Sequence, residues 1–167
     1  MAKKEGGGYT AEPLGSENPD YNLKSEILAA EVGVQFQSGI QNGAFLFHSY
    51  ADHTVVLTDL RGSVLHQIKC ASERDRGEIH LSSCGKFFGF CGDSSELRVW
   101  TIVFKSGTFV EVKRLPSLIG HKARLAAFAF SPDSTRILSL AVDNVFKLGI
   151  ERYLTLLLII SYGAKGW

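Results

Sequence analysis

The sequence predicts an all-β protein built from consecutive antiparallel sheets, and two observations lead to this prediction. From Val34 onward, short apolar runs alternate with brief segments rich in Gly, Asp, Ser and Asn. Glycine (17) and phenylalanine (11) are abundant, whereas proline (4) and methionine (1) are scarce, which suits many short strands joined by glycine turns. Because the connections are short, successive strands are expected to pair antiparallel.

The apolar runs give the expected strands and the expected division of the chain. Leu154 to Ile160 is also a predicted buried strand, since a membrane-spanning helix needs roughly 20 apolar residues. Only Leu23 to Val32 would suit a helical turn or two. Residues 1–32 are predicted to end a preceding unit and connect to a repeat region over 33–160, with a short tail at 161–167. The other expected strands are 44–50, 54–59, 63–69, 86–91, 97–104, 108–115, 124–130, 136–141 and 145–150.

Composition excludes several function classes. The 167 residues are 45% hydrophobic and carry 18 Lys and Arg against 17 Asp and Glu, so no electrostatic drive toward nucleic acid is evident. Three cysteines, Cys70, Cys84 and Cys91, are too few and too irregular for a disulfide framework, and an odd number suits a reducing compartment. The opening residues have no apolar core of a secretory signal.

An internal repeat organises the chain. Three segments, starting at Gly43, Gly85 and Ser134, align without gaps, each with a small residue at a tight turn followed by two apolar strands. Their spacing is close to the ~40–45 residues of a four-stranded propeller blade. Since such a blade cannot bury its own faces, stacking neighbouring blades must do so. The expected architecture is a partial β-propeller of about three four-stranded antiparallel blades.

The third repeat resembles the WD40 pattern, in which a His, a strand Ser or Thr, a turn Asp and a terminal Trp form a hydrogen-bonded chain. Gly120 and His121 precede the strand AFAFSPDS and the hairpin RILSLAVDNVFKLGI. The resemblance implies that His121, Ser139 and Asp143 occupy three of the four positions, with Gly149 at the Trp position.

The other two repeats resemble the same pattern less completely. In the second repeat Trp100 stands at the Trp position, with Asp93 or Ser94 near the Asp position. In the first repeat Asp52 stands at the Asp position and Thr58 replaces the Trp. The resemblance therefore implies five structural anchors, which are Asp52, Trp100, His121, Ser139 and Asp143.

Residues 6–148 resemble the transducin beta-like members of this family. The stretches that carry the resemblance include DHTVVLTDLRGSVLHQI, LSSCGKFFGFCG, LRVWTIVFKSGTFVEV and IGHKARLAAFAFSPDS. The resemblance implies residence at the cytosolic face of the endoplasmic reticulum, a part in its unfolded-protein stress response, and contact with a membrane stress kinase. The family's anchoring segment has no counterpart here, so a cytoplasmic location is the alternative expectation. Because the resemblance ends after Leu148, a truncated gene product is a further hypothesis.

Structural roles account for the residues that could otherwise suggest catalysis or metal binding. His121 is interpreted as a buried structural histidine bonded to Ser139 and Asp143, rather than as a base or metal ligand. Cys84 and Cys91, with His80 nearby, lack the paired spacing of a zinc site. Gly85-Lys86 and the Gly6–Gly8 run lack the remainder of a phosphate-binding loop. The sequence contains no GxSxG or HExxH motif.

These observations predict a non-catalytic scaffold that binds protein partners through loops and inter-blade grooves. No catalytic, cofactor-binding or metal-ligating residue is predicted, and neither a cofactor nor a small-molecule substrate is expected. Two alternatives remain open, an RNA-associated regulatory platform and a non-functional fragment whose uncovered sheet faces would aggregate.

Overall fold

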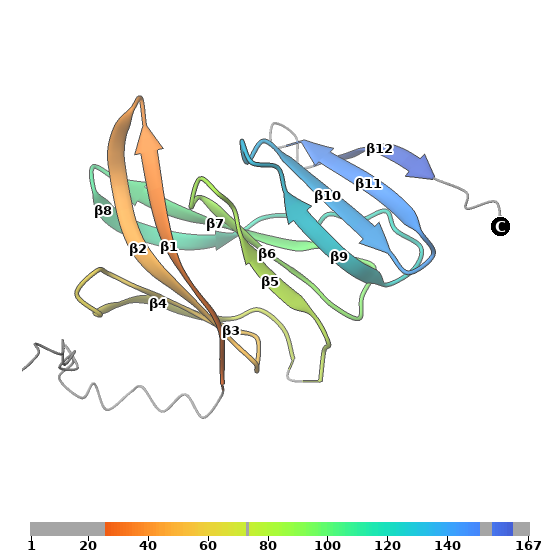
Figure 1. Cartoon of the computed structure of the whole chain (residues 1–167), viewed down its shortest axis with the longest axis horizontal. Helices are drawn as coiled ribbons and strands as arrows, with labels where there is room; N and C mark the ends of the chain where they lie inside the picture. The colour runs from red at the N-terminus through yellow and green to blue at the C-terminus, as the bar shows by residue number, and fades with distance from the viewer. Residues whose placement is uncertain (1–25, 73, 151–154, 162–167) are drawn as a thin grey trace, which may run out of the picture.

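Three four-stranded antiparallel sheets follow one another along the chain (Figure 1). The computed structural model describes residues 26–72, 74–150 and 155–161, with side chains described up to Leu148. All regular secondary structure in these ranges is β, and each sheet consists of four consecutive strands in order. The predicted all-β class with three four-stranded units is confirmed. The predicted strand of a preceding unit before residue 26 and the tail after Ser161 lie outside the described residues.

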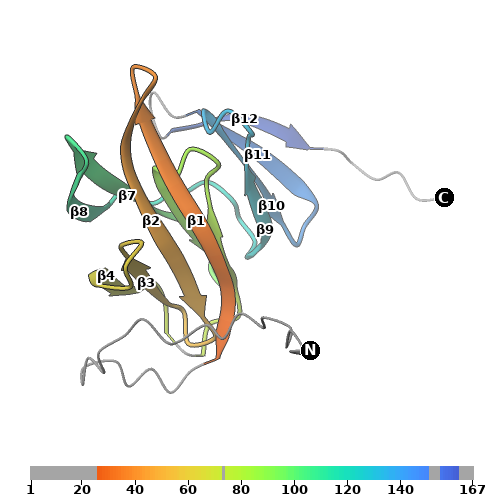
Figure 2. The same cartoon turned by 60° about the vertical axis from the view of Figure 1, so that its left-hand side comes forward.

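The first sheet contains β1 (Ile27–Gln37), β2 (Ile40–Tyr50), β3 (Thr54–Thr58) and β4 (Val64–Lys69). Its two 11-residue strands make a hairpin whose tip extends beyond the neighbouring strands (Figures 1 and 2). The tip is formed by Ser38 and Gly39, both with positive φ.

The second sheet contains β5 (Glu78–Leu81), β6 (Phe87–Cys91), β7 (Arg98–Lys105) and β8 (Thr108–Arg114). The β6 strand is buried along its whole length, as expected of a strand covered on both faces. The apolar runs of the sequence do not predict β5, because this short strand contains only two apolar residues, Ile79 and Leu81.

The third sheet contains β9 (Leu125–Phe130), β10 (Arg136–Ala141), β11 (Val145–Ile150) and β12 (Thr155–Ser161). On β10, the side chains of Ile137, Ser139 and Ala141 are buried while Leu138 is exposed, which is the period-two pattern of a strand packed on one face. The predicted strand over Leu154 to Ile160 is present as β12.

Two expectations from the sequence are wrong. The segment Leu23 to Val32 is not helical in its described part, because β1 starts at Ile27 and pairs with β2 throughout. The predicted start of the repeat region, residue 33, therefore lies inside this strand. Gly43 is not at a tight turn either, because it lies within β2 opposite Gln35. By contrast, its counterparts Gly85 and Ser134 do lie at turns with positive φ.

Aromatic side chains fill the space between the first two sheets. Phe45 and Phe47 of β2 face this space and are fully buried. Phe45 stacks on Phe104 with ring centroids 5.7 Å apart, and Phe47 contacts Phe88 at 5.4 Å. The Phe104 ring lies where a Cβ atom on Gly43 would be, so the sheets approach closely at this glycine.

A second cluster joins the second and third sheets. Its buried members include Val99 of β7, Leu125 and Phe128 of β9, and Ile137 of β10. The Phe128 ring packs against Gly89 as Phe104 packs against Gly43, with its nearest atom 2.7 Å from the point that a Cβ atom on Gly89 would occupy. Each sheet junction therefore uses one aromatic ring seated on a glycine of the neighbouring sheet.

Trp100 is the largest side chain of the first cluster. It is 2% exposed and stacks on Phe88, with centroids 5.2 Å apart and ring planes 5° from parallel. Its indole Nε1–H has no hydrogen-bond partner among the described residues. Trp100 therefore contributes apolar packing, while its buried polar atom opposes that contribution.

Trp100 is expected to respond differently to two substitutions. Trp100→Ala should lower the free energy of unfolding by roughly 3–5 kcal/mol, because it empties a large aromatic site. Trp100→Phe should cost clearly less, since it keeps an aromatic ring on Phe88 and removes a buried N–H that costs about 1–3 kcal/mol. Urea denaturation of both variants measures this difference, and equal losses would contradict it.

Candidate functional site

The predicted contact between His121 and Ser139 is present. His121 lies in the connector before β9 and is 7% exposed, and its Nε2 is 2.8 Å from Ser139 Oγ on β10. The Ser139 hydroxyl also lies 3.5 Å from the carbonyl oxygen of Lys147. A hydroxyl that donates to this carbonyl accepts from the imidazole, so the geometry favours the Nε2–H tautomer of His121.

Asp143 does not complete the predicted hydrogen-bonded chain. Its carboxylate accepts from the backbone N–H of Val145 at 3.2 Å and so stabilises the exposed β10–β11 turn. The Nδ1 atom of His121 has no hydrogen-bond partner in the described part of the chain. Burial and the charge of Lys147 lower the pKa of His121, and the more weakly acting Asp143 opposes them.

A basic side chain performs the anchoring role in the second and third sheets. Lys147 Nζ donates to the carbonyl oxygen of Gly120, directly before His121. At the equivalent register of the second sheet, Arg98 donates to the carbonyl oxygen of Cys70 at 3.2 Å. Both bonds tie the connector from the preceding sheet to the third strand of the next one. They therefore fix where β5 and β9, the first strands of the second and third sheets, begin.

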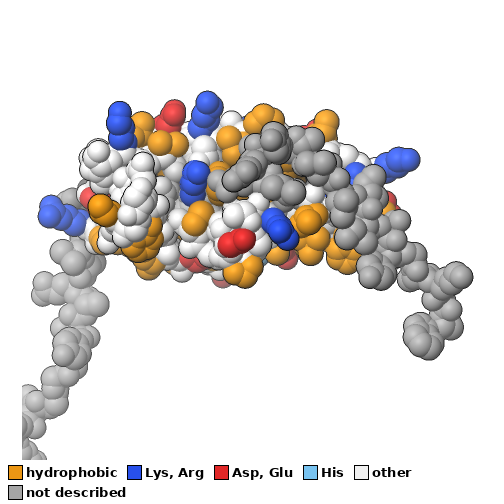
Figure 3. All heavy atoms as spheres, turned by 90° about the horizontal axis from the view of Figure 1, so that it is seen from above, with side chains coloured by type: hydrophobic (Ala, Val, Ile, Leu, Met, Phe, Trp, Pro, Cys, Tyr) orange, Lys and Arg blue, Asp and Glu red, His pale blue; other side chains and the backbone are white. Residues whose placement is uncertain are grey.

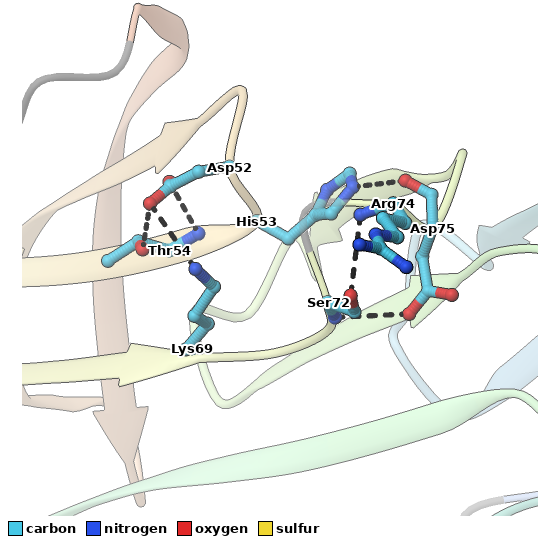
Figure 4. A network of polar contacts seen from close by, with 7 residues as sticks. All are labelled: Asp52, His53, Thr54, Lys69, Ser72, Arg74 and Asp75. Atoms are coloured by element: carbon cyan, nitrogen blue, oxygen red, sulfur yellow. Dashed lines mark hydrogen bonds and ion pairs between the residues drawn. The ribbon is translucent and has the colours of Figure 1, made fainter.

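Asp52 organises the turn between β2 and β3 (Figure 4). Its carboxylate accepts from the backbone N–H of Thr54 at 3.1 Å and from the Thr54 hydroxyl at 2.9 Å. The Nζ atom of Lys69, at the end of β4, lies 3.9 Å from the same carboxylate. Asp52 is therefore a turn-stabilising aspartate that also contacts β4, the last strand of the first sheet.

His53 is an anchor that the sequence analysis missed. It has φ 64° and is 5% exposed, and its Nε2 lies 2.6 Å from the carbonyl oxygen of Asp75 (Figure 4). Because a carbonyl only accepts, Nε2 is the donor. The ring also contacts Phe90 of β6 at 5.1 Å, and its own carbonyl accepts from Cys70 N–H. The one available signal was a histidine directly after the turn aspartate.

His53 lies at the edge of a groove between the first and second sheets. The groove has a volume of about 220 Å³ and runs between β1 and β5, which are terminal strands of their sheets. Its polar lining includes Glu31, Ser49 and Glu78, and its apolar lining includes Leu28 and Ile79. The remaining lining residues are Ala29, His53, Gly77 and His80.

The described residues give no support for a metal site or for a reactive thiol at Cys70 or Cys91. No group of three or more His, Cys, Asp or Glu side chains in the described ranges is arranged to hold a metal ion. Burial raises the pKa of the Cys70 thiol to about 12 and that of Cys91 to about 11, so both thiols stay protonated at neutral pH.

Two further observations concern nucleic acid and membranes. On the face seen in Figure 3, lysine and arginine side chains are scattered singly rather than gathered into a patch. Among the residues with described structure there is no helix with the length and apolar character that a membrane span requires.

The two polar partners predicted for His121 should differ in their contribution to stability. His121→Ala should lower the free energy of unfolding by about 1–3 kcal/mol, because it leaves the buried Ser139 hydroxyl without its nearest partner. Asp143→Ala should cost less than about 1 kcal/mol, since it removes one exposed turn contact. Chemical denaturation of both variants measures this order, and a larger loss for Asp143→Ala would contradict it.

Stability should fall as the pH is lowered through the histidine range. Burial lowers the pKa of His48, His66 and His121 in the folded protein below the ordinary value of 6.5. The unfolded chain therefore takes up protons first as the pH falls below 6.5, which favours unfolding. Urea midpoints should decrease from pH 7.5 to 5, with a shallower slope in His121→Gln. Equal urea midpoints across this pH range would contradict a stabilising role for the neutral forms of these histidines.

The amino-acid sequence of this chain is similar to those of two known proteins. Transducin beta-like protein 2 of Homo sapiens is 34% identical over 149 residues, which are 89% of this chain and 31% of that protein. The Mus musculus protein of the same name is 33% identical over 149 residues, covering 89% of this chain and 32% of its own length. The chain thus spans about a third of the length of these relatives. No protein-family model matches it.

Comparison with solved structures agrees on the fold. The β-propeller domain of Cps50 (Swd1) from Myceliophteria thermophila superposes with a TM-score of 0.55 at 12% identity, covering 80% of this chain and 44% of that one. At this identity the likeness concerns the fold alone. Over most of its length the chain is therefore a homologue of transducin beta-like protein 2, and its three sheets have the fold of part of a WD40 β-propeller.

Proposed function

We propose that the chain serves as the interaction module of a scaffold that holds protein partners without transforming them. The observation that carries this proposal is the similarity to transducin beta-like protein 2 over 89% of the chain, together with the propeller fold. Proteins of WD40 propeller fold are generally non-catalytic, and the polar residues at the sheet junctions of this chain are used for anchoring.

The arrangement of the sheets supports a binding role. The innermost strands β1, β5 and β9 each form the end of their sheet, so one edge of each lacks a partner among the described strands. The β1 strand and the start of β2 expose Val32, Phe36 and Ile40, each at least 66% accessible. Open strand edges and exposed apolar side chains are features through which proteins recognise extended segments of other proteins.

The cellular setting in this proposal is the endoplasmic reticulum. The resemblance to transducin beta-like proteins implies an adaptor on its cytosolic face, with a membrane stress kinase of the unfolded-protein response as a partner. The near balance of 18 basic and 17 acidic residues gives no comparable support to an RNA platform.

In-cell photo-crosslinking tests this function. A photoreactive amino acid at Phe36 of the full-length protein should give adducts whose extra mass persists after ribonuclease treatment, because the partner is a protein. The same group at Val110, on the outer strand β8, is the exposed control and should give fewer adducts. Adducts removed by ribonuclease would contradict the proposal. Protein adducts found only outside the microsomal fraction would contradict the proposed setting.

A further inference from the structure

We propose that the groove between β1 and β5 binds a lysine or arginine side chain presented by an extended peptide segment of a protein partner. This inference rests on the scaffold function proposed above and specifies the chemistry of its ligand. The groove is lined by residues of two different sheets, so it exists only because the first and second sheets are packed together.

The charge of the groove favours a cation. Glu31 of β1 and Glu78 of β5 both line it, and no lysine or arginine among the described residues does so. The Glu31 carboxylate has no ion-pair or hydrogen-bond partner among these residues, and the carboxylate of Glu78 contacts only the exposed His80, at 3.1 Å. Both glutamates are exposed, so solvent screens each charge, but two negative charges beside one groove still select a cation over an anion.

A serine hydroxyl contributes to the groove. Ser49 of β2 is 3% exposed as a residue and lines the groove. A donor that enters the groove therefore meets a hydroxyl that can accept a hydrogen bond. An ammonium or guanidinium group carries several donors and can engage Ser49 and a carboxylate together.

The size and walls of the groove favour a side chain of a peptide over a cofactor. Its volume of about 220 Å³ is below the roughly 300–1,000 Å³ of small-molecule sites. Leu28 and Ile79 provide apolar walls, against which the methylene stem of a lysine or arginine packs. The open edges of β1 and β5 supply backbone donors and acceptors on both sides, which suit a segment in extended conformation.

The neighbouring groove shows that this preference is local. On the other side of β5, a groove of about 290 Å³ is lined by Arg76 and Arg124 as well as Glu78. Arg124 lies 3.7 Å from Asp93, so that groove has charges of both signs. Of these two grooves, only the one between β1 and β5 is lined by carboxylates without a lysine or arginine among the described residues.

Titration of the full 167-residue chain with defined peptides tests the proposal. The probes are the blocked pentapeptides TVKVT, TVQVT and TVEVT. Binding of each peptide is measured by the changes in the backbone amide NMR resonances of the protein. TVKVT should bind and shift the resonances of Glu31, Ser49 and Glu78, whereas TVQVT should bind at least tenfold more weakly and TVEVT not at all. Methylation of both valine nitrogens of TVKVT should also weaken binding, because it removes the N–H groups that pair with a strand edge.

Matched variants separate a local effect from a general charge effect. The double variant Glu31→Gln with Glu78→Gln should lose about tenfold in affinity for TVKVT. Glu96→Gln with Glu111→Gln removes the same charge from the β6–β7 turn and β8, and should leave the affinity unchanged. Equal affinity of wild type and the first double variant, equal binding of TVKVT and TVEVT, or no binding of TVKVT would overturn the proposal.

Failure of the groove proposal can be told apart from failure of the proposed scaffold function. If TVKVT does not bind but protein adducts still form at Phe36, the groove proposal fails and the scaffold function stands. If neither the peptide nor any protein partner is captured, both fail.

Discussion

The fold depends on burial of one sheet face by the next, because no sheet here can bury both of its own faces. The aromatic layer of Phe45, Phe47, Phe88 and Trp100 illustrates this, since two of these rings come from the first sheet and two from the second. The third sheet repeats the arrangement through Phe128 seated on Gly89. The hydrophobic contribution is therefore located between repeats, as in other repeat proteins.

Polar anchors turn this stacking into defined positions. An apolar layer resists separation but would tolerate sliding, whereas a hydrogen bond has a fixed direction and length. Arg98 and Lys147 each fix the connector that leads to an innermost strand, and His53 joins the first sheet to the connector before β5. The open strand edges and the grooves between them take their position from these bonds.

The sequence predicted most of the strands because apolar periodicity and turn residues report burial directly. The contact of His121 with Ser139 was implied by the resemblance to the WD40 pattern, in which these two positions are hydrogen-bonded. The sequence did not predict β1, whose alternation over Ala30, Val32, Val34 and Phe36 is preceded by residues that also suit a helix. It also placed Gly43 at a turn, because a gapless repeat alignment cannot show that one hairpin is longer than its counterparts.

Contacts between residues far apart in the chain were beyond a local interpretation of the sequence. Nothing near His53 indicates that its imidazole meets the carbonyl of Asp75, 22 residues further along the chain. The contact of Asp143 with its own turn is local, and the WD40 pattern directed attention to His121 instead. The same limit applies to the groove, because Glu31 and Glu78 are brought together only by the stacking of two sheets.

This separation of roles bears on where specificity arises in a repeat protein. Contacts that serve the same purpose at more than one sheet junction, such as a ring seated on a glycine or a basic donor to a connector, serve the fold and cannot distinguish partners. Features that occur once are free to do so. The longer β1–β2 hairpin, the contact of the His53 imidazole with the carbonyl oxygen of Asp75, and the two glutamates that line the groove between β1 and β5 each occur once among the described residues, and all three lie at the junction of the first two sheets. The proposed recognition site lies at that junction, where the stacked sheets supply the rigid support and the features that occur once supply the chemistry.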